Sequence, residues 1–298
     1  RLKKFDPTLK FYVNLTEELA LEQAAAVDRT RDRLGEWHPL RGIPWGAKDL
    51  IAYPKYPTTW GAPQFKDRIL NTKATVAAKL DQVGAVLVAK LALGALAMGD
   101  KWYGGPTKNP WNPAQGSSGS SAGSASATAA GCVGFSLGSE TLGSIMSPSR
   151  RCGVTGLRPT FGRVSRQGCM SLSWSMDKLG PICRSAEDCA LVFQAIHGGD
   201  GLDPSAVDRP FHWPVKVNMK RIKVGYVDDG RKLADREVLQ VFKDRGCKLV
   251  EIQLPGELPK ENIKKLVNSL EKCIIDVLKN YKINSLCPPC FVSGKCNV

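Results

Sequence analysis

The chain has 298 residues, of which 43% are hydrophobic, and this is enough for one large core or two smaller ones. No apolar run approaches the roughly 18 to 20 residues of a membrane-spanning helix, so we expect no membrane span. The formal net charge is +14. Because the lysines and arginines are scattered rather than gathered in a basic run with interleaved aromatic residues, we do not expect direct nucleic-acid binding.

The first part of the sequence alternates helical and strand-like patterns. Apolar residues at helical spacing predict a helix from Thr16 to about Leu34 and a second helix over Thr75–Val83. Leu40–Pro63 predicts a short strand followed by a loop, because its four prolines exclude a long helix. The apolar run Gly84–Leu93 begins as a buried strand. A helix followed by a buried strand indicates an α/β protein.

The same alternation continues in the second part of the chain. Cys132–Glu140 predicts another buried strand. Ser185–His197 predicts a helix, with Ser185 as its N-cap and acidic residues in its first turn. The segment from Ile222 to Pro255 reads as a strand, a helix ended by a glycine, and a second strand, which together predict a βαβ unit.

The character of the sequence changes after Pro255, where a lysine-rich amphipathic helix is expected. Three cysteines cluster beyond it, at Cys287, Cys290 and Cys296. They could hold zinc only with a fourth ligand from elsewhere, and no histidine lies nearby, so their role stays open. The other cysteines lie mostly beside apolar residues and are expected to be buried free thiols.

The run Gln115–Gly131 contains only Gly, Ala, Ser, Thr and one Gln, and three interpretations compete for it. A flexible linker is disfavoured, because the run leads directly into a buried strand and its Ala-rich second half suits a closely packed helix. A phosphate-binding P-loop is disfavoured, because the run has no lysine. The remaining interpretation is the wall of an active site.

A catalytic serine needs a base, because its hydroxyl is a weak nucleophile at neutral pH. The chain has three histidines, at His38, His197 and His212, and none lies in a nucleophile-like context. A lysine can serve instead if burial keeps its amine neutral. Lys48 is a candidate, because it lies in the apolar segment GIPWGAKDLIAY beside a single charged neighbour, Asp49.

Four ordered motifs resemble those of the amidase signature family, whose members are serine hydrolases and transferases acting on carboxamides. The motifs are GIPWGAKDL around Lys48, the serine-rich Ser118–Gly131, SETLGSIMSPS over Ser139–Ser149, and CGVTGLRPTFGRVSRQG over Cys152–Gly168. The resemblance extends roughly from Phe5 to Pro255. The four motifs in this order are specific, whereas the serine run alone would not be.

The resemblance implies a role for each matching residue. It makes Lys48 the base, Ser120 the bridging serine that follows a cis peptide bond, and Ser144 the nucleophile. Met98 matches a position that lines the substrate site. The oxyanion hole is expected from the backbone N–H groups of Thr141, Leu142, Gly143 and Ser144.

Three positions depart from the family pattern. Leu142 stands where the family has a glycine before the nucleophile turn, and Glu140 stands where it has an aspartate. Met146 replaces an arginine, for which Arg150 or Arg151 is a candidate substitute.

The resemblance implies an α/β fold with a mixed sheet covered by helices on both faces, and no metal or organic cofactor. It implies an amidase that hydrolyses the C–N bond of a small amide substrate. We expect a cytoplasmic location. Two alternatives stay open: the glutaminase A subunit of a tRNA-dependent amidotransferase, with B- and C-type subunits as partners, and an inactive remnant. Residues 1–256 are expected to form a partial amidase domain and residues 257–298 an unrelated helical, Cys-containing tail. Because family members usually continue further, we expect the chain to be a fragment.

Overall fold

The computed structural model describes residues 1–30, 38–227 and 233–253. It divides into two compact units, of which the first comprises Arg1–Phe211 and the second begins at His212. The tail expected over residues 257–298, with its cysteine cluster, lies outside the described residues.

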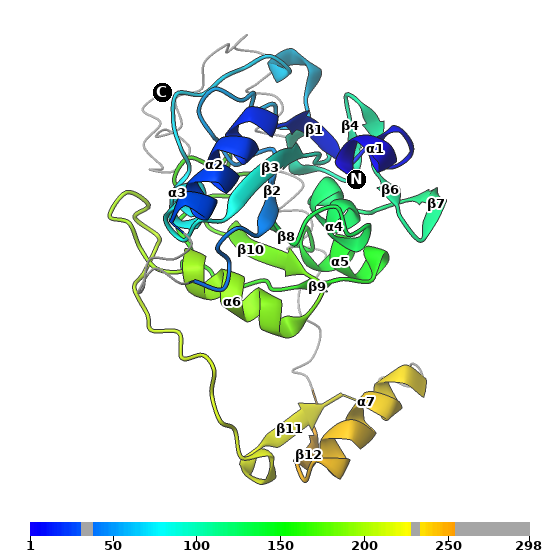
Figure 1. Cartoon of the computed structure of the whole chain (residues 1–298). Coiled ribbons are helices and arrows are strands. Elements are labelled where there is room, and N and C mark those ends of the chain that lie inside the picture. Colours follow the sequence, from blue (N-terminus) through cyan, green and yellow to red (C-terminus); the bar gives the residue numbers. More distant parts are fainter. Residues whose placement is uncertain (31–37, 228–232, 254–298) are drawn as a thin grey trace, which may run out of the picture. The chain divides into compact units, whose positions relative to one another are not determined.

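A six-stranded mixed sheet forms the centre of the first unit, in the order β1-β3-β2-β8-β10-β9 (Figure 1). The central strands β3, β2 and β8 are parallel, whereas β1, β10 and β9 are antiparallel to their neighbours. The strands are β1 (Tyr12–Leu15), β2 (Pro44–Lys48), β3 (Val86–Leu91), β8 (Phe135–Glu140), β9 (Thr155–Gly156) and β10 (Lys178–Cys183). Short strands pair separately as β4 (Lys101–Trp102) with β5 (Gly105–Pro106) and as β6 (Lys108–Asn109) with β7 (Asn112–Gly116).

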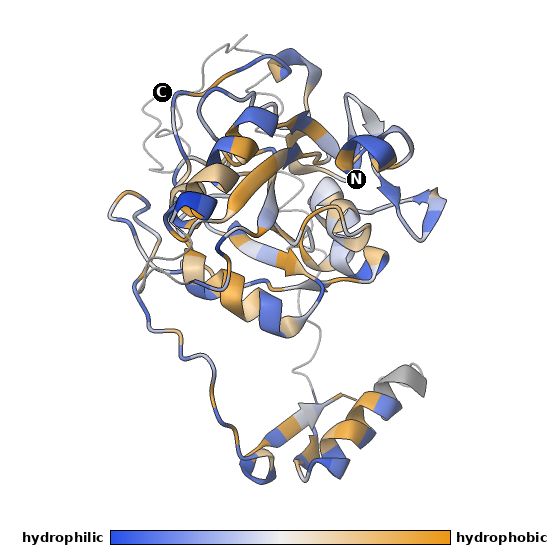
Figure 2. Cartoon of the chain, viewed as in Figure 1, coloured by the Kyte–Doolittle hydropathy of each residue, from blue (hydrophilic) through white to orange (hydrophobic). Residues whose placement is uncertain are grey.

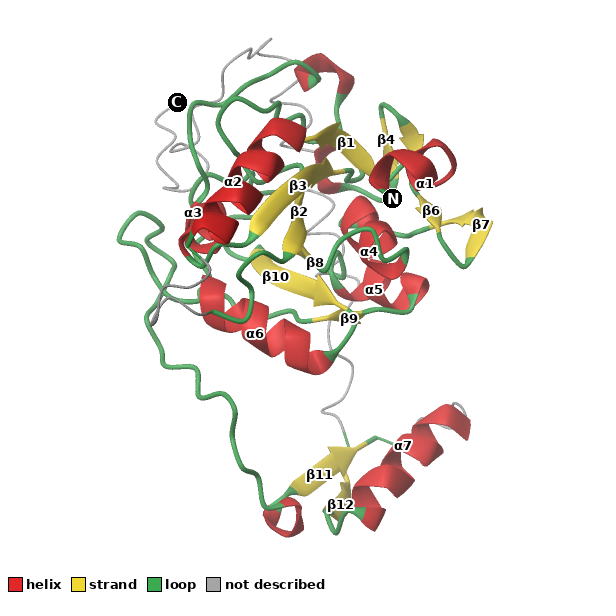
Figure 3. Cartoon of the chain, in the orientation of Figure 1, coloured by secondary structure: helices red, strands yellow, loops and turns green. Residues whose placement is uncertain are grey.

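Helices cover both faces of this sheet, as expected (Figures 1 and 3). Their bounds are α1 (Leu2–Leu9), α2 (Glu17–Arg29), α3 (Thr75–Gln82), α4 (Ala122–Ala129), α5 (Met146–Cys152) and α6 (Ala186–Ile196), with 3-10 turns at η1 (Pro63–Phe65) and η2 (Ala95–Ala97). The helices α2, α3 and α6 lie on one face, where Trp45, Leu87 and Phe135 of the sheet share the main hydrophobic core with α3 and α6. The helices α4 and α5 lie on the other face.

The predicted elements of the first unit are confirmed with small shifts at their ends. The helix expected to reach Leu34 ends at Arg29 as α2, and residues 31–37 lie outside the description. Ser185 caps α6, since its Oγ accepts the N–H of Asp188 at 3.0 Å. The sequence patterns did not predict α1, β1, α5 or the antiparallel strands β9 and β10.

Helix α4 is built from the serine-rich run and packs very closely on the sheet. Each residue from Ala122 to Thr128 is buried, and the helix appears in pale, neutral colours beside the hydrophobic β3 (Figure 2). A Cβ atom on Gly123 would lie 2.1 Å from the carbonyl oxygen of Phe11 and 2.5 Å from the nitrogen of Ala92. Only small residues permit this approach. The run is therefore a rigid wall and not a linker.

The second unit contains the predicted βαβ arrangement. Its elements are η3 (Met219–Arg221), β11 (Lys223–Tyr226), α7 (Leu233–Asp244) and β12 (Lys248–Glu251), and the two strands pair in parallel. None of the helices among the described residues is long and apolar enough to cross a membrane. The cysteines that the structure describes are free, and all but the half-buried Cys132 are buried, as expected.

Candidate active site

The parallel strands β2 and β8 bring two functional segments to the same edge of the sheet. Lys48 is the last residue of β2, and Glu140 is the last residue of β8. Because parallel strands end at the same edge, the residues that follow β8 lie beside those that end β2. The N-terminal end of α4 reaches this edge as well, since Ser121 hydrogen-bonds Ser139 there.

Lys48 is fully buried, and its hydrogen-bond partners are uncharged. Its Nζ lies 2.8 Å from Ser120 Oγ, 3.0 Å from Ser121 Oγ and 2.9 Å from Ser139 Oγ. It also donates to the backbone oxygen of Ser139 at 3.3 Å. Burial lowers the pKa of Lys48 from 10.5 to about 7, although the negative charges of Asp177 and Glu140 oppose this shift. A substantial fraction of this amine is therefore neutral at pH 7.

The peptide bond between Gly119 and Ser120 is cis, as the resemblance implied. Gly119 lies against the segment that follows η2, because a Cβ atom on it would lie only 1.7 Å from the carbonyl oxygen of Gly99. Ser120 is buried, and its backbone oxygen accepts the N–H of Gly94 at 3.3 Å. Close backbone packing on both sides thus fixes the position of the Ser120 side chain next to Lys48.

The turn between β8 and α5 contains the four expected oxyanion-hole residues. Gly143 has φ +87°, and a Cβ atom built on it would meet nothing within 4 Å, so the turn is open on this side. The Glu140 carboxylate accepts the backbone N–H groups of Ile145 at 2.8 Å and Met146 at 3.0 Å. A hydrogen bond from Ser147 N to the Gly143 oxygen, at 2.7 Å, closes the turn.

Glu140 is charged and forms an ion pair with Arg158, which the sequence analysis did not single out. Burial opposes its ionisation, but the backbone N–H groups of Met146, Ile145 and Gly143 and the Arg158 guanidinium outweigh burial and lower its pKa. Arg158 Nη1 lies 3.3 Å from Glu140 Oε1. Among the described residues, Arg158 is thus the guanidinium beside this turn, rather than Arg150 or Arg151.

The structure also links Ser144 to the serine-rich run. The backbone oxygen of Ser144 accepts the N–H of Ser121 at 3.1 Å, and Ser144 itself is half-buried. On the other side of the turn, Thr141 Oγ1 donates to the buried carboxylate of Asp177. The Lys178 ammonium donates to the Thr141 oxygen at 3.1 Å. Contacts from both sides hold the turn in place.

Met98, the expected substrate-site residue, is 39% exposed at the end of η2. It precedes Gly99, whose carbonyl abuts Gly119, so it lies near the cis peptide bond. Leu142 and Met146 flank Ser144 in the chain and are 53% and 48% exposed. The leucine that replaces the family's glycine therefore fits without being packed into the core.

Sequence reasoning did not identify three residues that contact these groups. Ser121 and Ser139 both hydrogen-bond Lys48, and Asp177 holds Thr141 and accepts the Ser171 hydroxyl at 2.9 Å. The position of Ser139 at the end of a predicted strand, just before the oxyanion turn, was a usable signal. Asp177 had none, since it lies in an irregular segment far along the chain.

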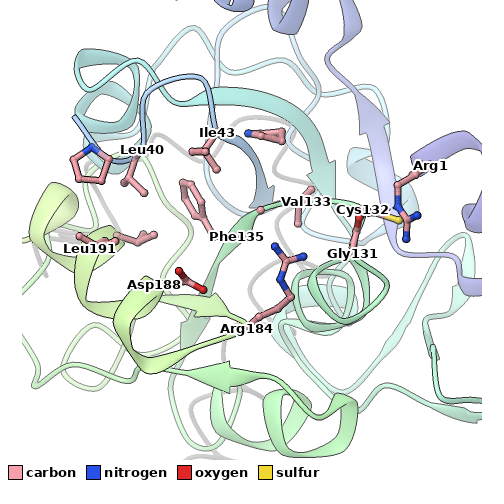
Figure 4. A pocket seen from close by; sticks show the side chains of 14 residues that line it. Arg1, Leu40, Ile43, Gly131, Cys132, Val133, Phe135, Arg184, Asp188 and Leu191 are labelled. Atoms are coloured by element: carbon pink, nitrogen blue, oxygen red, sulfur yellow. Dashed lines mark hydrogen bonds between the residues drawn. The ribbon is translucent and has the colours of Figure 1, made fainter. Parts of the chain in front are cut away.

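A separate cavity of about 530 Å³ lies at the opposite, amino-terminal ends of β2 and β8 (Figure 4). Phe135, Arg184 and Asp188 face it, together with apolar residues of α6 and of the segment before β2. None of the predicted site residues lines this cavity. Within residues 1–30, 38–227 and 233–253, no group of three or more His, Cys, Asp and Glu residues is arranged to hold a metal ion.

Comparison with known proteins identifies the family. The sequence matches the Amidase family over residues 1–258, and the chain therefore belongs to this family. It is 40% identical over 231 residues to the A subunit of the glutamyl-tRNA(Gln) amidotransferase of Moorella thermoacetica, covering 76% of this chain and 47% of that protein. It is 37% identical over 274 residues to the corresponding protein of Geobacter metallireducens, covering 86% of this chain and 55% of that one.

Solved structures show the same fold. The native peptide amidase of Stenotrophomonas maltophilia superposes with a TM-score of 0.81 at 28% identity, covering 95% of this chain and 63% of that one. The A subunit of the glutamyl-tRNA(Gln) amidotransferase of Thermotoga maritima superposes with a TM-score of 0.74 at 25% identity, covering 94% and 68%. The chain spans about half the length of the curated relatives it matches.

Proposed function

We propose that this protein is an amidase that hydrolyses a carboxamide C–N bond through Ser144, Ser120 and Lys48. The observation that carries the proposal is the fully buried Lys48 amine, whose Nζ lies 2.8 Å from Ser120 Oγ and whose pKa is lowered to about 7. A buried lysine with a neutral amine can act as a base, which a charged ammonium cannot do. Membership of the Amidase family supports the same chemistry.

In the proposed reaction, Lys48 takes the proton of Ser120 while Ser120 takes the proton of Ser144. Ser144 Oγ then attacks the amide carbonyl carbon, and the carbonyl oxygen becomes an oxyanion. As the C–N bond breaks, the proton returns through Ser120 to the leaving nitrogen, which departs as ammonia or an amine. Water attacks the acyl-enzyme by the same proton route and releases the carboxylic acid.

The turn after β8 is the proposed oxyanion hole. Backbone N–H groups of Thr141, Leu142, Gly143 and Ser144 would donate to the developing negative charge. Its rigidity supports this role, because Glu140 holds the following N–H groups and Asp177 holds the Thr141 hydroxyl. Donors fixed in advance cost no reorganisation during the reaction, and one such donor contributes about 3 kcal/mol.

The test is ammonia release from a panel of small amides, which includes glutamine, an aliphatic amide and a peptide amide. We expect release with at least one class and its loss in Ser144→Ala, with unchanged circular dichroism. Equal release by wild type and by Ser144→Ala contradicts the proposal. No release and no fluorophosphonate labelling of the folded chain would instead support an inactive remnant.

A second candidate, the glutaminase A subunit of a tRNA-dependent amidotransferase, is favoured by the names of the curated relatives, at 36–42% identity. Under this proposal the partners are B- and C-type subunits, and glutamine is the amide hydrolysed. Co-purification with such subunits, together with release from glutamine that rises in their presence, supports this candidate. Release confined to other amides contradicts it.

A further inference from the structure

Lys90 is fully buried, as Lys48 is, but it forms an ion pair with a carboxylate. Lys90 of β3 and Asp49, the residue after Lys48, are both 0% exposed and form an ion pair of 2.7 Å between Nζ and Oδ1. Buried ion pairs are costly to form, because both charges lose their hydration. The pair therefore needs an explanation beyond stability.

The hydrogen bonds of this pair are complete. The Lys90 ammonium donates to Asp49 Oδ1, to the Pro57 oxygen at 3.0 Å and to Thr58 Oγ1 at 3.1 Å, which uses all three of its N–H groups. The second carboxylate oxygen of Asp49 accepts the backbone N–H of Thr59 at 2.9 Å and the Thr59 hydroxyl. The Asp49 carboxylate is thus occupied without Lys48.

The sheet separates the two lysines. Successive residues of a strand point to opposite faces, so Lys48 and Asp49 diverge. Lys48 points to the α4 face, where Ser120 and Ser121 lie. Lys90 is the register partner of Ala47, whose side chain belongs to the core on the opposite face. Asp49 therefore meets Lys90 and not its chain neighbour.

We infer that the Asp49–Lys90 pair is a positioning device for the proposed reaction: it occupies the carboxylate nearest to Lys48 in the chain and leaves Lys48 to its uncharged partners. It also fixes the end of β2, because Asp49 N donates to the Leu91 oxygen at 2.9 Å beside the Lys90 contact. The inference rests on the proposed function of Lys48 as the base, and a base without an ionic partner keeps its amine neutral.

Other charged groups lie near Lys48 and near the Asp49–Lys90 pair. Burial lowers the pKa of Lys48, and the negative charges of Asp177, before β10, and of Glu140, at the end of β8, oppose this shift, while α4 carries no titratable side chain. On the opposite face, burial lowers the pKa of Arg68 and raises the pKa of Tyr103. The negative charge of Asp49 opposes the first shift and adds to the second. The Arg68 guanidinium lies 3.7 Å from the centre of the Trp60 ring. These groups are unchanged in the variants below.

The experiment measures the pH midpoint of fluorophosphonate labelling in four folded variants. Lys90→Met leaves an unpaired carboxylate, so its midpoint should rise by about 0.5 to 1.5 pH units. Asp49→Asn leaves an unpaired ammonium, so its midpoint should fall by a similar amount. The neutral double variant Asp49→Asn/Lys90→Met and the charge-preserving Lys90→Arg should stay within about 0.3 pH units of the wild type.

Midpoints of both single variants within about 0.3 pH units of the wild type, or shifts of both in the same direction, overturn the inference. If a single variant does not fold, a lysine 13Cε NMR titration of the wild type and of the charge-preserving Lys90→Arg decides, with the Lys48 resonance assigned through Lys48→Met. The inference predicts that the Lys48 signal titrates between pH 6 and 9 with the same midpoint in both proteins. A midpoint that differs by more than about 0.3 pH units between them overturns it. Absent wild-type labelling contradicts the proposed function instead, and the NMR result still tests the pair.

Discussion

Lys48 Nζ lies 2.8 Å from Ser120 Oγ, in a fully buried site where no carboxylate of the described residues pairs with the lysine. This relationship joins the end of a parallel strand to a serine that follows a cis peptide bond. It depends on the small residues of α4, which allow the serine-rich run to approach the sheet. The charge and the packing at this contact can each be tested by substitution.

Replacing Lys48 by Met should make the protein more stable at pH 7. The pKa falls from 10.5 to about 7, so burial of this amine costs on the order of 4 kcal/mol at pH 7. Loss of its hydrogen bonds offsets part of this cost, and we expect a net gain of about 1 to 3 kcal/mol in the free energy of unfolding.

The gain should shrink as pH rises from 7 to 10.5, because over this range the unfolded amine still binds the proton that the folded amine has lost, and the stability of the wild type therefore rises with pH. Urea unfolding at several pH values measures it. Lys90→Met is the matched control, since it also removes a fully buried lysine but leaves Asp49 unpaired, and should cost about 3 to 5 kcal/mol. Destabilisation of both variants to the same degree would contradict the neutral state of Lys48.

Activity should rise with pH through the pKa of Lys48. The base works only when it is deprotonated, so kcat/KM or the labelling rate should fall about tenfold per pH unit below pH 7 and level off above it. The measurement is a pH profile between 5 and 9 in buffers of constant ionic strength. A rate that is independent of pH between 5.5 and 8 contradicts a lysine base.

Replacing Ser120 by Ala should remove the group between Lys48 and the proposed nucleophile. We expect a fall of about 10²- to 10⁴-fold in the labelling rate, with thermal stability changed little. Ser147→Ala is the control, because Ser147 is exposed on the same side of the site and bonds the Ser118 hydroxyl at 2.8 Å. That variant should label within about twofold of the wild type. Equal rates in the two variants rule out a proton-transfer role for Ser120.

Replacing Gly123 by Ala should test the close approach of α4. The added Cβ would meet backbone atoms of Phe11 and Ala92, which cannot rotate away, so we expect a loss of about 2 to 4 kcal/mol. The half-buried Ala129→Ser, on the same helix, should change stability by less than about 1 kcal/mol. Chemical denaturation compares the two, and a neutral effect of Gly123→Ala argues against the tight wall.

Replacing Glu140 by Gln should loosen the turn that precedes α5. Despite burial, its pKa is lowered by the N–H groups of Met146, Ile145 and Gly143, so its stabilising effect is present above the ordinary carboxyl range and is lost as pH falls through the lowered value. We expect a cost of about 1 to 2 kcal/mol at pH 7 that shrinks as pH falls through the lowered pKa of Glu140. Unfolding curves at pH 7 and at successively lower pH values measure it, and a cost that does not change with pH contradicts a charged Glu140.

The sequence predicted most of the fold because its elements carry local signals. Ser185 with the acids after it marked α6, and the apolar run Ala85–Ala89 marked β3. The antiparallel β10 escaped prediction because Lys178–Cys183 contains a glycine, a proline and a polar start, and its pairing with β8 is a contact across the sheet. The helix expected to continue to Leu34 ends at Arg29, where the pattern carries no distinct stop signal.

Part of the candidate site was predictable, because some of its residues also lie in segments with a local sequence signal. Ser120 and Ser144 lie in motifs that the resemblance identified. Lys48 was also a candidate base without the resemblance, because it lies in an apolar segment with a single charged neighbour. The contacts of Asp177 with Thr141 and of Lys90 with Asp49 join segments distant in the chain. Periodicity and composition carry no information about such pairs, so only the folded arrangement reveals them.

The most direct test of Lys48 as the base for Ser144 is to map the residue that a fluorophosphonate modifies, by peptide mass spectrometry at pH 8. We predict a single adduct on Ser144 that is absent from Ser144→Ala and greatly slowed in Lys48→Met. An adduct on another serine, or labelling of Ser144 that proceeds equally fast without the lysine, would contradict this role.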